Sequence, residues 1–299
     1  MLFIKIEYVL WITSLYKMKA FEKSTRSGND ASNKARELVL STLLESSFPE
    51  STPERDLQDD LRRALDTVAT HSGIQYSSVT MVHKGGRMYN YDFDALYTVP
   101  EGVISRKIEF KYGCSSIPKL PQILSLSVKQ FLPEFIPYWW NLLDQYTALD
   151  EGITVPKPSL EDYSKVVGTI HSELPFFVQL KEREEFFKKE KHKVVNDGIA
   201  TFLQQAPTFS YEFIQERLRS QQEKYFLCWN RTMSVDFFTD HDLSNLHYHS
   251  VTKNCILMHS DGAIFSLLLR WRNHKGILNP AWQISVKRKI DIQTNKDRT

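Results

Sequence analysis

Charged side chains of the types that bind a metal ion stand close together in the stretch NYDFDALYTVPEGVISRKIEFKYG, residues 90–113. Asp92 and Asp94 are two residues apart, and so are Glu109 and Lys111. Neighbouring carboxylates raise each other's pKa unless a cation lies between them. Two carboxylates, completed by backbone carbonyls and waters, suit Mg²⁺, and an adjacent ammonium can orient a metal-activated water. The spacing therefore points to phosphodiester hydrolysis.

Three predicted strands carry and surround these residues. Alternating polar and apolar side chains predict strands over residues 76–83, 87–99 and 103–113, separated by glycine-containing turns at 84–86 and 100–102. Successive side chains on a strand point to opposite faces. The two aspartates therefore share one face of the second strand, and the glutamate and lysine share one face of the third. If these strands pair, one aspartate lies beside the glutamate.

Two helices are predicted before the strands. The first covers residues 35–47, and the second begins at Pro53 after a Thr52 cap and ends before Gly73. Apolar residues of the second helix form one stripe at helical spacing, namely Leu57, Leu61, Leu65 and Val68. The order helix, strand, strand, strand indicates a mixed α/β fold.

Apolar segments follow the third strand. Residues 117–132 and 135–149 are predicted to be helical, and a proline-containing break at 150–159 marks a candidate boundary. We expect three regions. They are an N-terminal extension or linker over 1–34, a catalytic core over 35–150, and a C-terminal α+β region over 151–299 that recognises DNA or completes the core.

A leading helix, then Asp94 on one strand and Glu109-Phe110-Lys111 on the next, make up the pattern of this region. The pattern resembles the PD-(D/E)XK nuclease superfamily, the fold of many restriction enzymes and repair exonucleases. The resemblance covers roughly residues 50–130. It implies a restriction-endonuclease-like αβββα core with a mixed central sheet, acting as a deoxyribonuclease on DNA with Mg²⁺ or Mn²⁺ as cofactor. It further implies that Asp94 and Glu109 bind the metal and that Lys111 lies at the water.

Two more positions match the superfamily. Glu54, at the start of the leading helix, resembles the extra acid that some members use, and Gln122 resembles the glutamine of a Q-x-x-x-Y element in the helicase-associated branch. The sequence also departs from the pattern. Phe93 stands where the motif has proline, and Leu126 stands where the Q-x-x-x-Y element has tyrosine.

The charges also allow other interpretations. We prefer Asp94 to Asp92 as the ligand because it is nearer the strand end that meets the turn. The alternative is a hairpin whose charges pair with one another, with either aspartate on Lys111 and with Glu109 on one of the basic residues at 106–107. Two further alternatives are a non-catalytic nucleic-acid-binding protein that retains the nuclease fold, and a protein-interaction domain.

The composition is that of a globular protein. Of its 299 residues, 41% are hydrophobic and 12% aromatic, which supports a packed core, and the net charge is only +2. Three widely spaced cysteines favour a reducing, intracellular compartment over a disulfide framework. The apolar first residues are interrupted by Lys5 and Glu7 and are too short for a membrane span. We therefore expect no membrane association, and a homodimer is compatible with the sequence.

Basic residues gather near the C-terminal end. They alternate with aromatic residues around Trp271, a pattern that can contact a phosphate backbone and stack on bases. An edge strand with arginines extended along an apolar surface is the alternative. The predicted DNA contacts are Arg270, Arg272, Lys287, Arg288 and Lys289.

Histidines and a cysteine of the kind found in zinc sites occur at residues 241–259. Their spacing lacks close ligand pairs at both ends, so surface histidines are the simpler interpretation. The residues are His241, His247, His249, Cys255 and His259.

Overall fold

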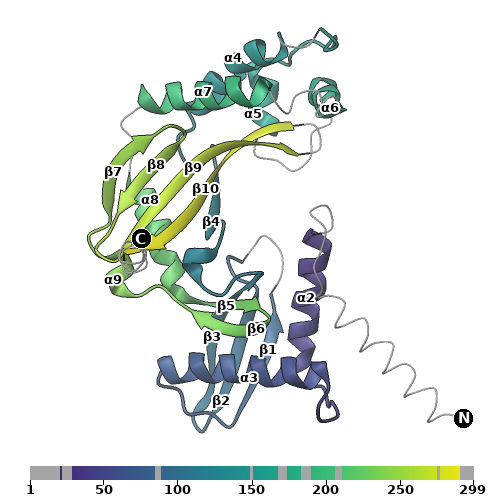
Figure 1. Cartoon of the computed structure of the whole chain (residues 1–299), viewed down its shortest axis with the longest axis vertical. Helices are drawn as coiled ribbons and strands as arrows, with labels where there is room; N and C mark the ends of the chain where they lie inside the picture. The colour runs from purple at the N-terminus through teal and green to yellow at the C-terminus, as the bar shows by residue number, and fades with distance from the viewer. Residues whose placement is uncertain are drawn as a thin grey trace, which may run out of the picture. The chain divides into compact units, whose positions relative to one another are not determined.

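The structure, a computed structural model, describes the following residues: 21, 29–84, 89–148, 151–167, 174–182, 190–205, 211–274 and 277–289. They form a mixed α/β fold with two five-stranded sheets (Figure 1). Among these residues, no helix combines the length and the apolar character needed to span a membrane.

The chain folds into two compact units. Unit 1 contains the described residues up to Lys119 together with Arg219–Thr239. Unit 2 contains Leu120–Leu218 and the described residues from Asp240 onward. Since the chain leaves each unit and re-enters it, a single boundary near residue 150 does not describe the organisation.

Unit 1 is built on a mixed sheet. β1 (Ser78–His83), β2 (Phe93–Val99) and β3 (Gly102–Tyr112) form an antiparallel meander. β5 (Lys224–Asn230) then pairs parallel to β3, and β6 (Thr232–Asp236) pairs antiparallel to β5. The sequence predicted the meander and a mixed sheet. It gave no signal for β5, which lies more than a hundred residues further along the chain.

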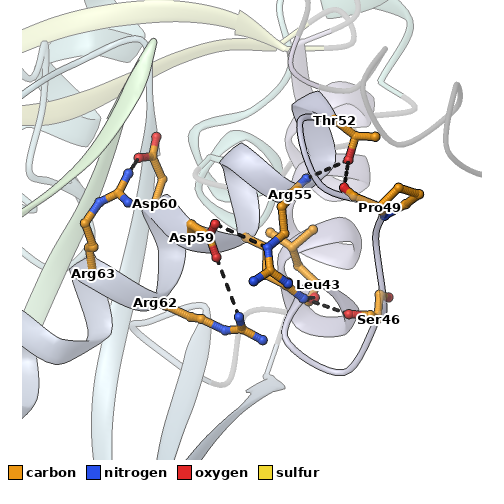
Figure 2. Close-up of polar contacts among 10 residues, drawn as sticks. Leu43, Ser46, Pro49, Thr52, Arg55, Asp59, Asp60, Arg62 and Arg63 are labelled. Carbon is orange, nitrogen blue, oxygen red and sulfur yellow. Dashed lines mark hydrogen bonds and ion pairs between the residues drawn. The ribbon is translucent and has the colours of Figure 1, made fainter.

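Two helices accompany this sheet: α2 (Asn29–Leu43) lies beside β1, and α3 (Pro53–His71) runs across the strands (Figure 1). Their junction is fixed by polar contacts (Figure 2). The Thr52 hydroxyl accepts a hydrogen bond from the N–H of Arg55 at 3.3 Å and donates to the carbonyl of Pro49 at 2.9 Å. The predicted cap is thereby confirmed.

The core of unit 1 lies between the helices and one face of the sheet. Leu61, Leu65 and Val68 of α3 are fully buried, and so is Phe93 of β2. Phe21 belongs to the same core, where its ring packs edge-on against Trp229 with 5.2 Å between centroids. It lies within the predicted 1–34 extension. Most of that extension is outside the described residues, and its last part opens α2.

Unit 2 contains an antiparallel sheet in the order β4-β10-β9-β8-β7. The long hairpin of β9 and β10 is its centre (Figure 1). Trp282 of β10 is fully buried, and its indole N–H donates to the Phe131 carbonyl at 2.9 Å. The strands are β4 (Leu124–Ser127), β7 (His247–Thr252), β8 (Cys255–His259), β9 (Ala263–His274) and β10 (Ile277–Arg288). The helices are α4 (Phe135–Thr147), α5 (Leu160–Val166), α6 (Pro175–Glu182), α7 (Glu190–Gln204), α8 (Tyr211–Arg219) and α9 (Asp240–Leu243).

One predicted helix was wrong. Residues 117–132 instead form a single 3₁₀ turn, Ile117–Lys119, and then the strand β4. Pro118 and Pro121 interrupt a helix here because proline lacks the backbone N–H. The following Leu-Ser-Leu-Ser alternates in the manner of a strand and pairs with β10. The predicted helix over 135–149 is confirmed as α4.

Candidate functional site

The charged residues of unit 1 share the sheet face opposite the helices. On β2, Phe93, Ala95 and Tyr97 are buried in the core. Asp94, between the first two of them, therefore points to the other face, as alternation requires. It is aligned with Lys107 of β3 in the antiparallel register. Extending that register by two residues brings Asp92 opposite Glu109.

Asp92 lies just before β2, at the edge of a buried polar cluster. Its carboxylate accepts a hydrogen bond from the backbone N–H of Phe110 at 2.8 Å, and its own N–H donates to the carbonyl of Ile108 at 2.9 Å. Burial raises the pKa of Asp92 to about 7, and repulsion from the Glu109 carboxylate adds to the rise. The ionised form of Asp92 is therefore disfavoured by its loss of hydration and by the nearby negative charge of Glu109.

Glu109 is held between two lysines. One carboxylate oxygen is 2.5 Å from Nζ of Lys111, and the other is 3.0 Å from Nζ of Lys224. Only 13% of the Glu109 side chain is exposed. Burial alone would raise the pKa of Glu109, but the attraction of Lys111 and Lys224 outweighs it, and the pKa is lowered. Glu109 is therefore an ionised carboxylate.

Lys224 is a member of this cluster that the sequence analysis missed. It begins β5, where the parallel register aligns it with Lys107, and only 4% of its side chain is exposed. Its ammonium donates to the Glu109 carboxylate and to the backbone carbonyl of Asn90. Burial lowers the pKa of Lys224, and Glu109 offsets part of that effect. No local sequence signal marks Lys224, because its partners come from distant strands.

Lys111 has the opposite electrostatic balance. Burial opposes its charge, but the Glu109 carboxylate and then Asp92 more than compensate, so that the pKa of Lys111 is raised. About a quarter of its side chain, 26%, is exposed. Lys111 is thus a charged ammonium that combines a buried carboxylate partner with access to solvent.

The structure changes the choice between the two aspartates. Asp94, which the sequence analysis preferred, forms an ion pair with Lys84, with 3.0 Å between Nζ and Oδ2. The acid that interacts with Glu109 and Lys111 is Asp92. The sequence analysis used nearness to the turn as its criterion, whereas the end of the antiparallel ladder decides which aspartate lies beside Glu109.

Acids from both leading helices are buried or partly buried near the sheet. Glu54 is buried in the first turn of α3, where a carboxylate complements the helix dipole. The helical carboxylate that affects Asp92 is Glu37 of α2, which raises the pKa of Asp92 further. Glu37 is also 2.9 Å from Nε2 of His83.

The remaining predicted residues belong to unit 2. Gln122 precedes β4, and Leu126, at the expected tyrosine position, is buried in that strand. Arg270 on β9 donates to the Gln283 side chain at 2.7 Å, and Lys287 on β10 is exposed. Arg272 lies on β9, but its side chain is outside the described residues.

Besides Arg270, two of the predicted DNA contacts make bonds within the protein. Arg288 pairs with the buried Asp242 at 3.1 Å, and the Lys289 ammonium donates to the carbonyl of Ser260. These two side chains thus have structural partners, whereas Lys287 is the exposed cation of this segment.

The described histidines at 241–259 do not converge as a ligand set in the structure. The rings of His249 and His259 are stacked, with 3.8 Å between centroids and 11° between planes, and Nδ1 of His247 donates to the carbonyl of Asn245 at 2.6 Å. Stacked rings direct their nitrogen lone pairs side by side instead of at one point. Within the described part of the chain, no group of three or more His, Cys, Asp or Glu side chains is arranged to hold a metal ion.

Neither a scan against protein-family models nor a search of the curated proteins finds a match for this chain. Asp92, Glu109, Lys111 and Lys224 together form a cluster of charged side chains on one face of the sheet, which we call the acid–lysine cluster.

Proposed function

We propose that this protein is a Mg²⁺-dependent deoxyribonuclease, with Asp92 and Glu109 as the metal-binding carboxylates and Lys111 as the ammonium beside the attacking water. The observation that carries the proposal is the placement of Asp92 beside Glu109 at the end of the β2–β3 ladder, where the Asp92 carboxylate accepts a hydrogen bond from the N–H of Phe110. Two carboxylates in a half-buried site oppose each other's ionisation, and a divalent cation relieves that opposition.

The donor set fits such a cation. Mg²⁺ commonly uses one or two protein carboxylates and keeps several waters, so two acids are sufficient. The set contains oxygen donors, with no thiolate or imidazole among the residues of the acid–lysine cluster, and this favours a hard cation over zinc. Bound there, Mg²⁺ would supply an activated water and polarise a phosphoryl oxygen.

The side chains of the chain itself would have distinct roles. Glu109 is kept ionised by two ammonium groups and is ready to accept a cation. Lys111 is charged and partly exposed, so it can leave one Glu109 oxygen and stabilise negative charge on a phosphate. Lys224 is buried and bonded to Asn90 as well, so it stays with Glu109.

The main alternative is a nucleic-acid-binding protein that keeps the fold without cleaving. The observation in its favour is that both Glu109 oxygens already have lysine partners. The paired-hairpin alternative has partial support, since Asp94 and Glu109 do form ion pairs. Their partners differ from the expected ones: Asp94 pairs with Lys84 instead of Lys111, and Glu109 pairs with Lys111 and Lys224 instead of residues 106–107. Neither alternative explains why Asp92 is placed beside Glu109.

The test is a cleavage assay with purified protein on supercoiled, linear and single-stranded DNA in Mg²⁺, in Mn²⁺, in Ca²⁺ and in excess chelator. We expect cleavage in Mg²⁺ or Mn²⁺ and suppression by Ca²⁺, whose looser geometry misplaces the water. Undiminished cleavage in chelator would refute the metal-dependent mechanism. DNA retention without cleavage in any metal would favour the binding protein.

Two lysines on the same strand provide a matched pair of variants. Lys111→Ala should abolish cleavage. Lys107→Ala should retain it, because Lys107 lies on the same face but pairs with the exposed Glu223 at 2.8 Å. Equal losses in the two variants would show that the lysines act through general charge and not through the proposed site.

A further inference from the structure

Two cysteines of unit 1 lie together at the end of β3. Cys114 follows Gly113 directly after this strand, and Cys228 lies on β5. Both are buried and both are free thiols. They are separated by more than a hundred residues, so only the parallel pairing of β3 with β5 brings them near each other.

Backbone contacts locate the two thiols relative to each other. Cys228 is the register partner of Lys111, and Sγ of Cys114 turns back to within 3.6 Å of the Lys111 carbonyl oxygen. The chain beyond β3 stays beside β5, because the N–H of Gly113 donates to the carbonyl of Trp229 at 2.7 Å.

A contact on β6 confirms that Cys114 and Cys228 lie over the same patch of sheet. Ser234 is the register partner of Cys228, and its hydroxyl donates to the carbonyl of Ser115 at 3.0 Å. Ser115, which follows Cys114, is thus hydrogen-bonded to Ser234, which lies opposite Cys228 on β6. The two thiols are close enough for each to affect the pKa of the other.

The surroundings make the two thiols chemically different. The hydrogen bond from Cys228 lowers the pKa of Cys114, burial opposes this, and the Lys111 ammonium adds to the lowering. The pKa of Cys228 is raised by the same hydrogen bond and by burial. A thiolate is the reactive form of cysteine, and a nearby cation favours it. Cys114 is therefore the nucleophile and Cys228 the second thiol.

We propose that Cys114 and Cys228 form a dithiol–disulfide couple that is oxidised by hydrogen peroxide. The Cys114 thiolate attacks one peroxide oxygen, the O–O bond breaks, and the released hydroxide takes a proton, which leaves a sulfenic acid and water. The Cys228 thiol then attacks the Cys114 sulfur, the S–O bond breaks, and a second water leaves. In sum, two thiols lose two electrons and two protons, and one peroxide becomes two waters.

This couple would join the end of β3, three residues beyond Lys111, to β5. Its formation does not depend on nuclease activity, because it needs only the thiols and peroxide. Cys255 of unit 2, which is half-buried, is the internal comparison. Burial raises the pKa of its thiol, and neither Cys114 nor Cys228 lies on its strand, β8.

The test is peptide mapping of the full chain after treatment with hydrogen peroxide, followed by alkylation under denaturing conditions and digestion with trypsin. We expect residues 112–119 and 225–231 to appear as one linked peptide, lighter by two hydrogen atoms than the sum of the two, and to separate on reduction. The Cys255 peptide should remain unlinked.

Two variants complete the test. Cys228→Ser should trap Cys114 as a sulfenic acid that reacts with a dimedone probe, and Cys255→Ser should leave the linked peptide unchanged. Recovery of Cys114 and Cys228 as separately alkylated peptides after oxidation of the wild type would overturn the proposal, as would a linked peptide that contains Cys255.

Discussion

The acid–lysine cluster of unit 1 and the basic strands of unit 2 use charge in different ways. In unit 1, a carboxylate with 13% exposure is shared by two lysines, and a second acid lies beside it. In unit 2, the described charged side chains of β9 and β10 are exposed, as Arg270 and Lys287 are, or form a single pair, as Arg288 does with Asp242. Single pairs are satisfied within the protein, whereas the cluster contains an acid whose ionisation is opposed. We therefore place the chemistry in unit 1.

The largest effect on stability is expected at Glu109. In Glu109→Gln, the buried Lys224 loses its carboxylate, and leaving a buried charge uncompensated costs about 3–5 kcal/mol. The double variant Glu109→Gln with Lys224→Met removes both members and should recover most of the loss. Chemical denaturation of the two single variants and the double variant measures this coupling. A double variant no more stable than Glu109→Gln would contradict the pairing.

The next effect is the pH dependence of stability due to Asp92. Its pKa in the folded protein, about 7, lies above the ordinary value of 3.8. The stabilisation of its protonated form is complete below pH 4 and is lost as pH rises through 7. Asp92→Asn should therefore match wild type near pH 4 and exceed it at pH 8 by on the order of 2–4 kcal/mol in metal-free buffer. If the two proteins lose or gain stability in parallel across this pH range, the pKa of Asp92 is not raised in the folded protein.

A smaller effect is expected from the single pair in unit 2. Asp242→Asn removes the charge from a side chain with 5% exposure, while its partner Arg288 is 24% exposed and can be solvated. Loss of a charge-assisted hydrogen bond of this kind costs about 1–3 kcal/mol. Melting temperature should fall, and cleavage per folded molecule should be unchanged. A selective loss of cleavage would remove the contrast between the two units.

The smallest effect on stability is expected at Arg270 and Lys287, because both are exposed. If they contact the DNA backbone, the double alanine variant should lower the salt dependence of binding by roughly one to two units in log–log form. Arg288 and Lys289 serve poorly for this test, because they are only partly exposed and bond to Asp242 and to the Ser260 carbonyl. Arg270 is exposed, and its partner is the neutral Gln283 side chain. If the double variant has the same salt dependence of DNA binding as the wild type, Arg270 and Lys287 do not contact the DNA backbone.

Local patterns predicted the parts of the fold that depend on neighbouring residues. The meander of β1, β2 and β3 follows from alternation and short turns, and α3 follows from its cap and apolar stripe. Long-range pairing lies outside such patterns. Lys224 and Cys228 enter the neighbourhood of Lys111 only through β5, which pairs with β3 although the first segment of unit 2, Leu120–Leu218, lies between the two strands in the chain.

The arrangement of the charged residues was likewise predicted where it depends on spacing along one strand, and missed where it depends on pairing between strands. Glu109 and Lys111 share a face because of their spacing, and this holds in the structure. The choice between Asp92 and Asp94 depends on where the β2–β3 ladder ends and on the partner that each acid finds. Lys84 binds Asp94, and Phe110 and Glu109 surround Asp92. These contacts depend on the three-dimensional arrangement of the strands and cannot be inferred from a local sequence pattern.

The most direct test of the central claim is a calorimetric titration of Mn²⁺ into wild type, Asp92→Asn and Asp94→Asn. Both variants remove one carboxylate charge from residues two positions apart, so they are matched in sequence and in net charge. We predict that Mn²⁺ binding and cleavage are lost in Asp92→Asn and retained in Asp94→Asn. Wild-type Mn²⁺ affinity in Asp92→Asn, or its loss only in Asp94→Asn, would contradict the assignment of the metal site to Asp92 and Glu109.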